Sequence, residues 1–296
     1  MKLGYIGLGK MGLQMVARLV EKGHEPVVWN RSKEPVREAE KCGADSRETI
    51  SELIAALPVP RLIWVMVSHG AVSSIIDELS PLLSSGDTII DGGNSLFRET
   101  VKRGETLRGK AINFIDAGVS GGPSGARSGA CIMVGGEEVS VKKYEPLFRD
   151  LAAPNAFLRV GKTGAGHFAK MVHNGIEYGM MQALAEGFAV LRASPFKPSL
   201  AKLAALYNHK SVIKSRLVGW LESGFQMYGD DLDAVSGTVA QNGEGKWTVE
   251  VAEELQIPVP IIKGSVEYRK ITETAPSFTG KVLSTLRNQF GGHSIM

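Results

Sequence analysis

A glycine-rich turn near the N-terminus constrains the fold more than any other feature of the sequence. Gly7, Gly9 and Gly12 follow the apolar run 3–6 and precede residues 13–21, which have the pattern of a helix. In this strand-turn-helix context, the three glycines allow a tight turn, bring backbone close to a pyrophosphate and let the helix pack on the strand. The sequence therefore predicts a dinucleotide-binding loop, which consists of Gly7, Leu8, Gly9, Lys10, Met11 and Gly12.

Short apolar runs continue through the first half of the chain. They lie at residues 3–6, 26–29, 62–67, 88–91, 113–116 and 132–134. Runs without polar alternation, separated by helix-length spacers, are typical of a parallel sheet that is covered on both faces. After Val160 only helical patterns follow. We therefore predict an α/β protein with a Rossmann-type doubly wound parallel sheet over residues 1–162, followed by an all-helical domain over residues 163–296.

The helical half begins with a pattern that can run as one long central helix over residues 165–193. Its apolar residues occupy more than one side, so we expect it to be buried between neighbouring helices or at a subunit interface.

Charge and cysteine content exclude several classes of protein. The 34 Lys and Arg against 31 Asp and Glu leave a net charge of +3, and no run of five or six like charges forms a nucleic-acid arm or a membrane patch. This balance suits a small anionic ligand. Two cysteines, Cys42 and Cys131, are compatible with a reducing compartment. The N-terminal apolar run is too short for a signal peptide or a membrane span, so we expect a cytoplasmic protein.

The end of the second predicted strand bears on the choice of cofactor. An NAD enzyme usually offers Asp or Glu to the ribose there, whereas this chain has Asn30, Arg31 and Ser32. An Arg can pair with the adenosine phosphate of NADP and stack on adenine, whereas a carboxylate would repel that phosphate. The sequence therefore favours NADP, with NAD as the alternative if Arg31 is only a solvated loop cation.

One stripe of the long helix carries the residues most suited to catalysis. Counted from Lys170, the positions +3, +4, +7 and +8 hold His173, Asn174, Glu177 and Tyr178, which a helix places on one face. A neutral Lys170 could take a hydroxyl proton while hydride leaves the same carbon, and Glu177 could supply a proton. The alternative is a solvated polar stripe. The six histidines are scattered without metal-ligand spacing, so we predict a mechanism without a metal.

With these residues assembled, the chain resembles the β-hydroxyacid dehydrogenase superfamily and, within it, a short form of the decarboxylating 6-phosphogluconate dehydrogenase family. The superfamily shares the glycine motif and Lys-x-x-x-Asn. The more specific signals are His-Asn-Gly-Ile-Glu-Tyr at 173–178 and Phe-Gly-Gly-His at 290–293. Further matching segments are 30–32, 89–94, 118–122 and 243–248.

The resemblance implies oxidative decarboxylation of 6-phosphogluconate to ribulose 5-phosphate and carbon dioxide, with reduction of NADP, as in the pentose phosphate pathway and gluconate utilization. In this family mechanism Lys170 removes the C3 hydroxyl proton and Glu177 protonates C1 of the enediol. The implied contacts of the sugar acid are Asn94, Ser120, Gly121, Gly122, His173 and Asn174. The implied phosphate contacts are Tyr178, Arg269, Arg287 and His293. The cofactor is expected to lie near Val67, Ser68, His69 and Asn94.

The chain also departs from the family pattern. It is much shorter than the usual enzyme, and Asn242 stands where the family commonly has a phosphate-binding Lys, which puts phosphate recognition in question. In the long form the tail reaches a neighbouring subunit, so we expect a homodimer or homotetramer in which Arg287 and His293 serve either their own or the partner's site.

Two rival functions stay open. The first is a dehydrogenase of an unphosphorylated 3-hydroxy acid such as 3-hydroxyisobutyrate, which needs no phosphate cluster. The second is a non-catalytic NADP-binding sensor, which the intact polar stripe disfavours.

Overall fold

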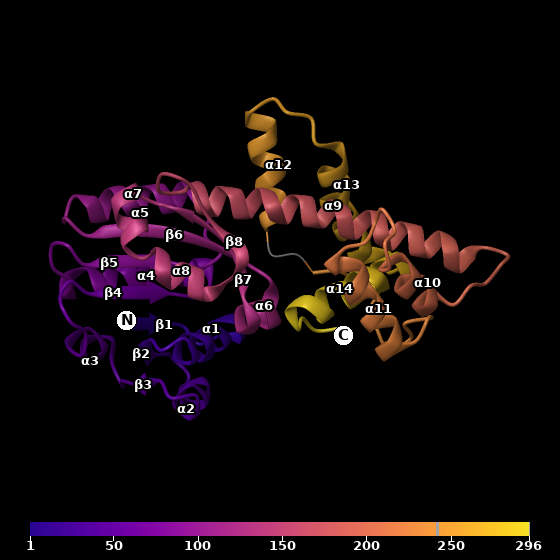
Figure 1. The fold of residues 1–296 in the computed structure, drawn as a ribbon. Coiled ribbons are helices and arrows are strands. Elements are labelled where there is room, and N and C mark those ends of the chain that lie inside the picture. The colour runs from indigo at the N-terminus through magenta and orange to yellow at the C-terminus, as the bar shows by residue number, and fades with distance from the viewer. Residues whose placement is uncertain (241–242, 296) are drawn as a thin grey trace. The chain divides into compact units, whose positions relative to one another are not determined.

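The chain packs as two compact units, Met1–Lys170 and Met171–Met296. The computed structural model describes residues 1–240 and 243–295, and Figure 1 shows that the first unit contains the sheet, whereas the second is helical. The domain boundary predicted at residue 162 lies just before the long helix and stays a prediction.

The first unit is built on an eight-stranded sheet with the order β3-β2-β1-β4-β5-β6-β7-β8. Its strands are β1 (Lys2–Ile6), β2 (Glu25–Trp29), β3 (Asp45–Ser46), β4 (Leu62–Val65), β5 (Thr88–Asp91), β6 (Asn113–Ser120), β7 (Ala130–Gly135) and β8 (Ala152–Gly161). Because β1 lies between β2 and β4, the strand order reverses beside β1. In open α/β sheets ligands bind outside the carboxyl ends of the strands at this point. The Rossmann-type prediction is confirmed.

Helices cover both faces of this sheet. They are α1 (Lys10–Glu21), α2 (Lys33–Lys41), α3 (Ile50–Ala55), α4 (His69–Leu79), the 3-10 turn η1 (Ser80–Leu82), α5 (Phe97–Arg108), α6 (Gly122–Ser128), α7 (Glu138–Lys143) and α8 (Glu145–Leu151). Successive strand residues point to opposite faces, and the hydrophobic clusters follow this rule. Trp64 packs in the cluster that includes α1 and α8, whereas Ile63 and Val65 pack in the cluster that includes α3 and α4.

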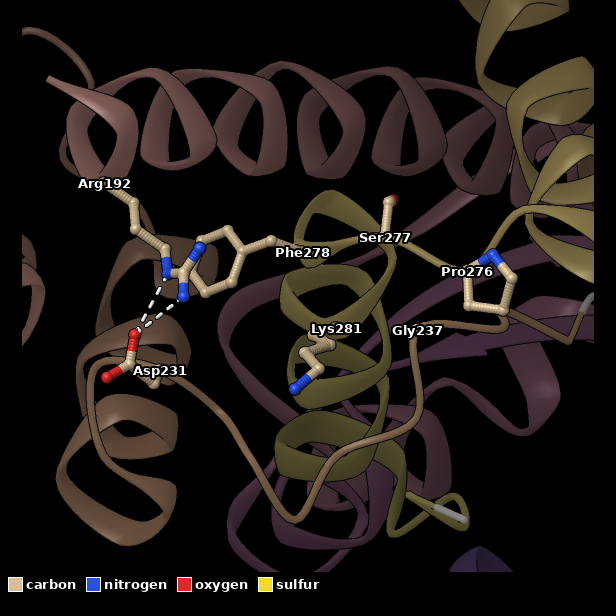
Figure 2. Close-up of a pocket in the computed structure, with 7 residues that line it drawn as sticks. All are labelled: Arg192, Asp231, Gly237, Pro276, Ser277, Phe278 and Lys281. Carbon is tan, nitrogen blue, oxygen red and sulfur yellow. Dashed lines mark hydrogen bonds and ion pairs between the residues drawn. The ribbon is translucent and has the colours of Figure 1, made fainter.

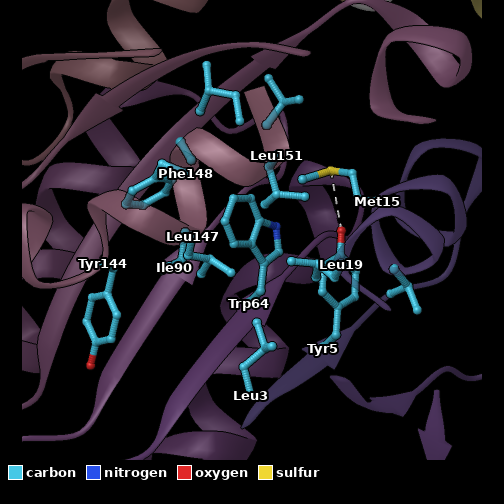
Figure 3. Packing of buried hydrophobic residues seen from close by; sticks show 14 of the residues in the cluster. Leu3, Tyr5, Met15, Leu19, Trp64, Ile90, Tyr144, Leu147, Phe148 and Leu151 are labelled. Atoms are coloured by element: carbon cyan, nitrogen blue, oxygen red, sulfur yellow. Dashed lines mark hydrogen bonds between the residues drawn. The ribbon is translucent and has the colours of Figure 1, made fainter. Parts of the chain in front are cut away.

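Aromatic side chains fill the centre of the first cluster (Figure 3). Trp64 stacks on Tyr5 with 6.2 Å between ring centroids and lies tilted against Phe148 at 5.8 Å. The Tyr5 hydroxyl donates to the sulfur of Met15 at 3.5 Å. Since both faces of β1 and β4 are buried, these strands have apolar residues at successive positions rather than at alternate ones.

The last strands of the sheet differ from the prediction. β7 runs antiparallel to β6, because residues 121–129 between them are fewer than the dozen or so that a parallel crossover needs. β3 and β8 were not among the predicted runs. β8 is an edge strand and contains Pro154, a residue that edge strands tolerate but that, taken alone, signals a turn.

The second unit has no strand among its described residues. Its helices are most of α9 (Ala165–Ala193, which begins in the first unit), α10 (Leu200–Tyr207), α11 (Arg216–Tyr228), α12 (Glu244–Glu254), α13 (Pro260–Thr274) and α14 (Phe278–Gly291). Met181 and Phe188 of α9 are buried, whereas Ile176, Met180 and Val190 of the same helix are exposed. The prediction of an all-helical second part with a long helix is confirmed.

Candidate active site

The glycine-rich turn links β1 to α1 and leaves space at the helix N-terminus. Gly7 has φ +102°, and a Cβ there would lie 2.3 Å from the Met66 carbonyl oxygen. A Cβ at Gly12 would lie 2.1 Å from the carbonyl oxygen of Gly7, whereas a Cβ at Gly9 would meet nothing within 4 Å. Gly7 and Gly12 therefore serve close packing, and Gly9 leaves open space.

These features fit a dinucleotide. The first turn of α1 has no acidic residue, and a helix N-terminus with open backbone suits a pyrophosphate. Of the other predicted loop residues, Leu8 is buried, Met11 is half-buried and Lys10 is exposed.

The segment after β2 is tied to this turn. The backbone N–H of Leu8 donates to Asn30 Oδ1 at 3.0 Å, and Asn30 Nδ2 donates to the Ser32 carbonyl at 2.9 Å. Arg31 and Ser32 are exposed. Asn30 therefore holds the loop, and Arg31 is left at the surface beside it.

The loops after β4 and β5 meet at the same edge of the sheet. A Cβ at Gly93 would lie 2.8 Å from the Val67 carbonyl oxygen. Ser68 caps α4 and His69 begins it, and both are exposed, as is Asn94. The structure thus brings the predicted cofactor residues from the four loops after β1, β2, β4 and β5 to the carboxyl ends of neighbouring strands.

A buried aspartate that the sequence analysis gave no role supports the loop after β5. Asp91 is fully buried, and its oxygens accept the N–H of Gly93 at 3.0 Å and the hydroxyl of Ser95 at 2.9 Å. Arg103 Nη1 lies 3.7 Å from the same carboxylate. In the sequence, the signal for this role is a carboxylate at the end of the otherwise apolar run 88–91.

The end of β6 carries the other predicted substrate residues of the first unit. Ser120 ends β6, and Gly121 and Gly122 have φ values of +136° and +63°. A Cβ at Gly118 would lie 2.4 Å from the Cβ of Lys170. Lys170 is half-buried and therefore lies against β6 two residues before Ser120.

In the second unit the polar stripe of α9 continues with contacts among its own side chains. His173 Nδ1 lies 2.9 Å from Asn174 Oδ1 and 3.8 Å from Glu177 Oε2. All three side chains are half-buried, and Tyr178 is buried. The stripe is therefore a partly covered network.

Two glycines bring α12 against this part of α9. A Cβ at Gly175 would lie 2.6 Å from Thr248 Cγ2, and a Cβ at Gly245 would lie 2.5 Å from Tyr178 Cδ2. Thr248 Oγ1 donates to the Met171 carbonyl at 2.8 Å. The glycines of segments 173–178 and 243–248 thus have a packing role, and Asn242 lies outside the described residues.

Two buried arginines surround Tyr178. Arg269 and Arg287 are 1% and 7% exposed, and the Arg269 guanidinium lies 3.5 Å from the centroid of the Tyr178 ring. Arg269 Nη1 also donates to the Ala240 carbonyl at 3.4 Å. The carboxylate of Glu244 is also buried, at 4% exposed, and its charge acts on both arginines.

The electrostatics of this arginine cluster favour an anion. Burial lowers the pKa of Arg269 to about 10, and the charge of Arg287 adds to this change, whereas Tyr178, Glu177 and Glu244 oppose it. Burial also lowers the pKa of Arg287. A buried charge is costly unless it is paired, so two neighbouring buried cations form a site that an anion would stabilise.

The C-terminal tail is held by specific contacts. Asn288 Nδ2 donates to the His293 carbonyl at 2.8 Å, and the Ser236 N–H donates to the Ile295 carbonyl at 2.6 Å. The His293 ring packs edge-on against Phe290 with 6.3 Å between centroids. That His293 contacts phosphate stays a prediction.

A cavity of about 260 Å³ lies elsewhere in the second unit (Figure 2). None of the predicted site residues lines it. Its lining comprises Arg192, Asp231, Gly237, Pro276, Ser277, Phe278 and Lys281. Arg192 pairs with Asp231 at 2.8 Å and lies over the ring of Phe278, so these contacts already balance its charge.

Residues 1–240 and 243–295 contain neither a metal-binding cluster nor a membrane-spanning helix. No group of three or more His, Cys, Asp or Glu in that part of the chain is arranged to hold a metal. No helix there is both long and apolar enough to cross a membrane.

Comparison with known proteins agrees with the two-part architecture. Residues 2–164 match the model for the NAD binding domain of 6-phosphogluconate dehydrogenase, and residues 166–285 match that for the enzyme's C-terminal domain. YqeC of Bacillus subtilis, provisionally named a 6-phosphogluconate dehydrogenase, is 46% identical over 294 residues, 99% of both chains.

A second relative and a solved structure indicate the same family. The NAD(+)-dependent, decarboxylating 6-phosphogluconate dehydrogenase of Haloferax volcanii is 38% identical over 297 residues, which cover 100% of this chain and 98% of the relative. The solved 6-phosphogluconate dehydrogenase of Plasmodium falciparum has a TM-score of 0.84 and 29% identity over 92% of this chain and 62% of its own. The protein therefore belongs to the 6-phosphogluconate dehydrogenase family of NAD(P)-binding oxidoreductases.

Proposed function

We propose that this chain oxidises and decarboxylates 6-phosphogluconate to ribulose 5-phosphate and carbon dioxide, with NADP as the oxidant. The observation that carries the proposal is the buried cluster of Arg269, Arg287 and Tyr178. A phosphate dianion would offset the cost of burying two guanidinium groups, and its oxygens match the donors of Arg. An unphosphorylated acid would leave this cluster without its anion.

The first step belongs to residues of the first unit. The nicotinamide of the bound cofactor supplies the hydride acceptor. Lys170, which lies against β6 at Gly118, takes the proton of the C3 hydroxyl as that carbon is oxidised to a ketone. Asn94 and Ser120 hold the sugar acid at the ends of β5 and β6, where their side chains reach the surface.

The second step breaks the bond between C1 and C2 of the β-keto acid. The carboxylate leaves as carbon dioxide, and its bonding electrons form an enediolate that protonated Lys170 stabilises. Glu177 then protonates the carbon that was C2 of the β-keto acid. This carbon becomes C1 of the product, ribulose 5-phosphate. Glu177 suits this role because it is half-buried and has His173 at 3.8 Å.

NADP is favoured over NAD by the residues after β2. Asn30 orients the glycine loop, and Arg31 is exposed next to it. A guanidinium in this place pairs with a phosphate on the adenosine ribose. The Haloferax relative is NAD(+)-dependent, so NAD is the alternative within the family.

We also propose a homodimer or homotetramer. Ile176, Met180 and Val190 expose apolar surface along α9, and a second copy would cover it. Arg287 lies in the same unit as Tyr178, so we assign it to its own chain's phosphate site rather than the partner's.

The experiment that tests the proposed function supplies 6-phosphogluconate with either NADP or NAD. Reduced cofactor and released carbon dioxide are followed together. The proposal expects both in equal amounts and faster turnover with NADP. Reduction of the cofactor by 3-hydroxyisobutyrate alone would establish the unphosphorylated rival, and cofactor binding without turnover of either acid would establish a sensor.

A further inference from the structure

A buried carboxylate lies at the start of the helix that carries Lys170. Asp116 of β6 is fully buried. One of its oxygens accepts the N–H of Gly164 at 2.6 Å, and the other accepts the N–H of His167 at 2.8 Å. The first N–H groups of a helix have no partner within the helix. The N–H of His167 is one such group, and Gly164 directly precedes α9, so Asp116 caps this helix from a neighbouring strand.

The backbone around this carboxylate is too close for side chains. A Cβ at Gly166 would lie 2.6 Å from the Met133 carbonyl oxygen, and one at Gly135 would lie 2.5 Å from Asp116 Oδ1. The first turn of α9 therefore packs directly on the backbone of β6 and β7. Packing of this kind permits only a narrow range of helix positions.

The same face of β6 carries the capping group and the contact with Lys170. Asp116, Gly118 and Ser120 are alternate residues of β6, so they point to one face of the sheet. Lys170 follows His167 by three residues, which is about 4.5 Å along a helix. A shift of the capped turn therefore shifts Lys170 along β6 by a similar amount.

A second contact holds the capped turn from the side of α5. The hydroxyl of Thr100 lies 2.8 Å from His167 Nδ1, and both side chains are buried. Phe97 packs edge-on against Phe168 with 5.1 Å between centroids. α5 follows the loop that contains Asn94, so the turn is fixed between the predicted substrate loop and β6.

Burial is costly for this carboxylate, so Asp116 depends on the hydrogen bonds that it accepts from the capped turn. Burial raises the pKa of Asp116, while His167 and the two backbone N–H groups oppose that change. A buried acid in the sheet would be unfavourable unless its hydrogen bonds were made. Those bonds exist only when α9 is in its present position.

We propose that Asp116 is a positioning residue for catalysis, because its carboxylate fixes the first turn of α9 and thereby sets where Lys170 lies against β6 at Gly118. This inference rests on the proposed role of Lys170 as the base.

The test compares Asp116→Asn with Asp87→Asn. Asp87 is a matched control, since it is also fully buried and accepts two backbone N–H groups, from Arg61 at 2.6 Å and Ser84 at 2.9 Å. It precedes β5, at the opposite end of the strands from Ser120. Asn keeps one acceptor and turns an NH2 group toward the other N–H.

We expect Asp116→Asn to lower kcat about tenfold to a hundredfold, the size expected for a displacement of about 1 Å. The Kd for NADP should stay close to wild type, because its predicted contacts lie on the loops after β1, β2, β4 and β5. The KM for 6-phosphogluconate should rise by a smaller factor than kcat falls, because the predicted phosphate contacts Arg269 and Arg287 lie on α13 and α14. Asp87→Asn should lose stability and keep its kcat. An unchanged kcat in folded Asp116→Asn, or an equal loss of kcat in both variants, would overturn the inference.

Thr100→Val is a milder second variant that keeps the shape of the side chain and removes its hydroxyl contact with His167. It should lower kcat by a smaller factor than Asp116→Asn does. A wild-type kcat would show that the contact between Thr100 and His167 does not help to position Lys170. This variant keeps the inference open to test if Asp116→Asn does not fold.

Amide hydrogen exchange separates this inference from the proposed function. In Asp116→Asn, exchange should accelerate over residues 164–171 and not in the rest of the sheet, whereas Asp87→Asn should leave residues 164–171 protected. If wild type does not turn over 6-phosphogluconate, the proposed function fails while this measurement still reports on the capped turn. Unchanged protection of residues 164–171 would refute the positioning role itself.

Discussion

The two units build their candidate binding sites from different kinds of groups, backbone in the first and side chains in the second. In the first unit the site is mostly backbone, because glycines at strand ends let main-chain groups approach one another, as at Gly7 and Gly12. In the second unit it is made of large buried side chains, Arg269, Arg287 and Tyr178. A backbone site depends on exact geometry, so an added side-chain atom disrupts it. A side-chain site depends on charge, so removal of one side chain weakens binding without destroying the fold. The predictions below test this difference.

The largest effect should come from Lys170, where the side chain acts in a unit otherwise built on backbone. Lys170→Met removes the amine of the proposed base and keeps an unbranched side chain that is one heavy atom shorter. We expect kcat to fall by about 10²–10⁴-fold, the usual contribution of a general base, with little change in the Kd for NADP. Steady-state kinetics and cofactor titration measure both. The control is Lys162→Met at an exposed position. Turnover near wild type in Lys170→Met would show that Lys170 is not the base.

A pair of glycine substitutions tests the backbone site. The Cβ of Gly12→Ala would meet the Gly7 carbonyl oxygen, whereas that of Gly9→Ala has open space in the protein. We expect Gly12→Ala to lose about 3 kcal/mol of unfolding free energy, or roughly 6–12 °C in Tm. Gly9→Ala should keep the wild-type Tm and raise the Kd for NADP.

Thermal unfolding and cofactor titration of both variants decide this pair. Equal Tm values for Gly12→Ala and Gly9→Ala would contradict the division between a packing glycine and a ligand-facing glycine.

The side-chain site is tested by Arg287→Ala. Loss of one charged hydrogen-bonding partner of phosphate should raise the KM for 6-phosphogluconate about 10–100-fold, while the Kd for NADP stays the same. Arg216→Ala is the control, because Arg216 belongs to the same unit but is exposed and lies over the ring of Trp220. If both variants kept the wild-type KM, phosphate would bind elsewhere or the substrate would carry none.

The smallest effect is the response of stability to a simple anion. Inorganic phosphate at about ten times its Kd should stabilise the second unit by about 1.4 kcal/mol, or roughly 4 °C in Tm, because it offsets the repulsion between Arg269 and Arg287. Chloride at the same ionic strength is the control. A phosphate response that persists in Arg287→Ala would show that the anion acts at another site.

Sequence patterns predicted the sheet of the first unit well because its signals are local. The glycine turn and Asn30 each follow an apolar run directly, so finding the strand also finds the loop. The loops at 67–69 and 92–94 also follow such runs, but only the family resemblance gave their residues a role. The antiparallel β7 and the edge strand β8 were harder, since pairing direction depends on connection length and Pro154 interrupts the run. The strand that ends in Ser120 also contains Asp116, whose partners Gly164 and His167 lie about fifty residues later in the sequence, beyond the range of any local pattern.

The second unit was harder to predict because its site depends on packing between helices. Periodicity could place Tyr178 on the stripe of α9, but only a family resemblance pointed to Arg269 and Arg287. An Arg in a helix is usually exposed, so the sequence alone could not distinguish these two from surface cations. Their burial against Tyr178 is information that the fold adds.

The hydrogen bond from Leu8 to Asn30 has a consequence for how cofactor preference can evolve or be redesigned. The residue that keeps the glycine loop in shape is separate from its exposed neighbour Arg31, which we propose pairs with the adenosine phosphate. On this proposal, substitutions at positions 31 and 32 should exchange one nicotinamide coenzyme for the other while Asn30 keeps the loop intact. Laboratory selection for a switched coenzyme should accordingly accumulate changes at those two surface positions and preserve Asn30.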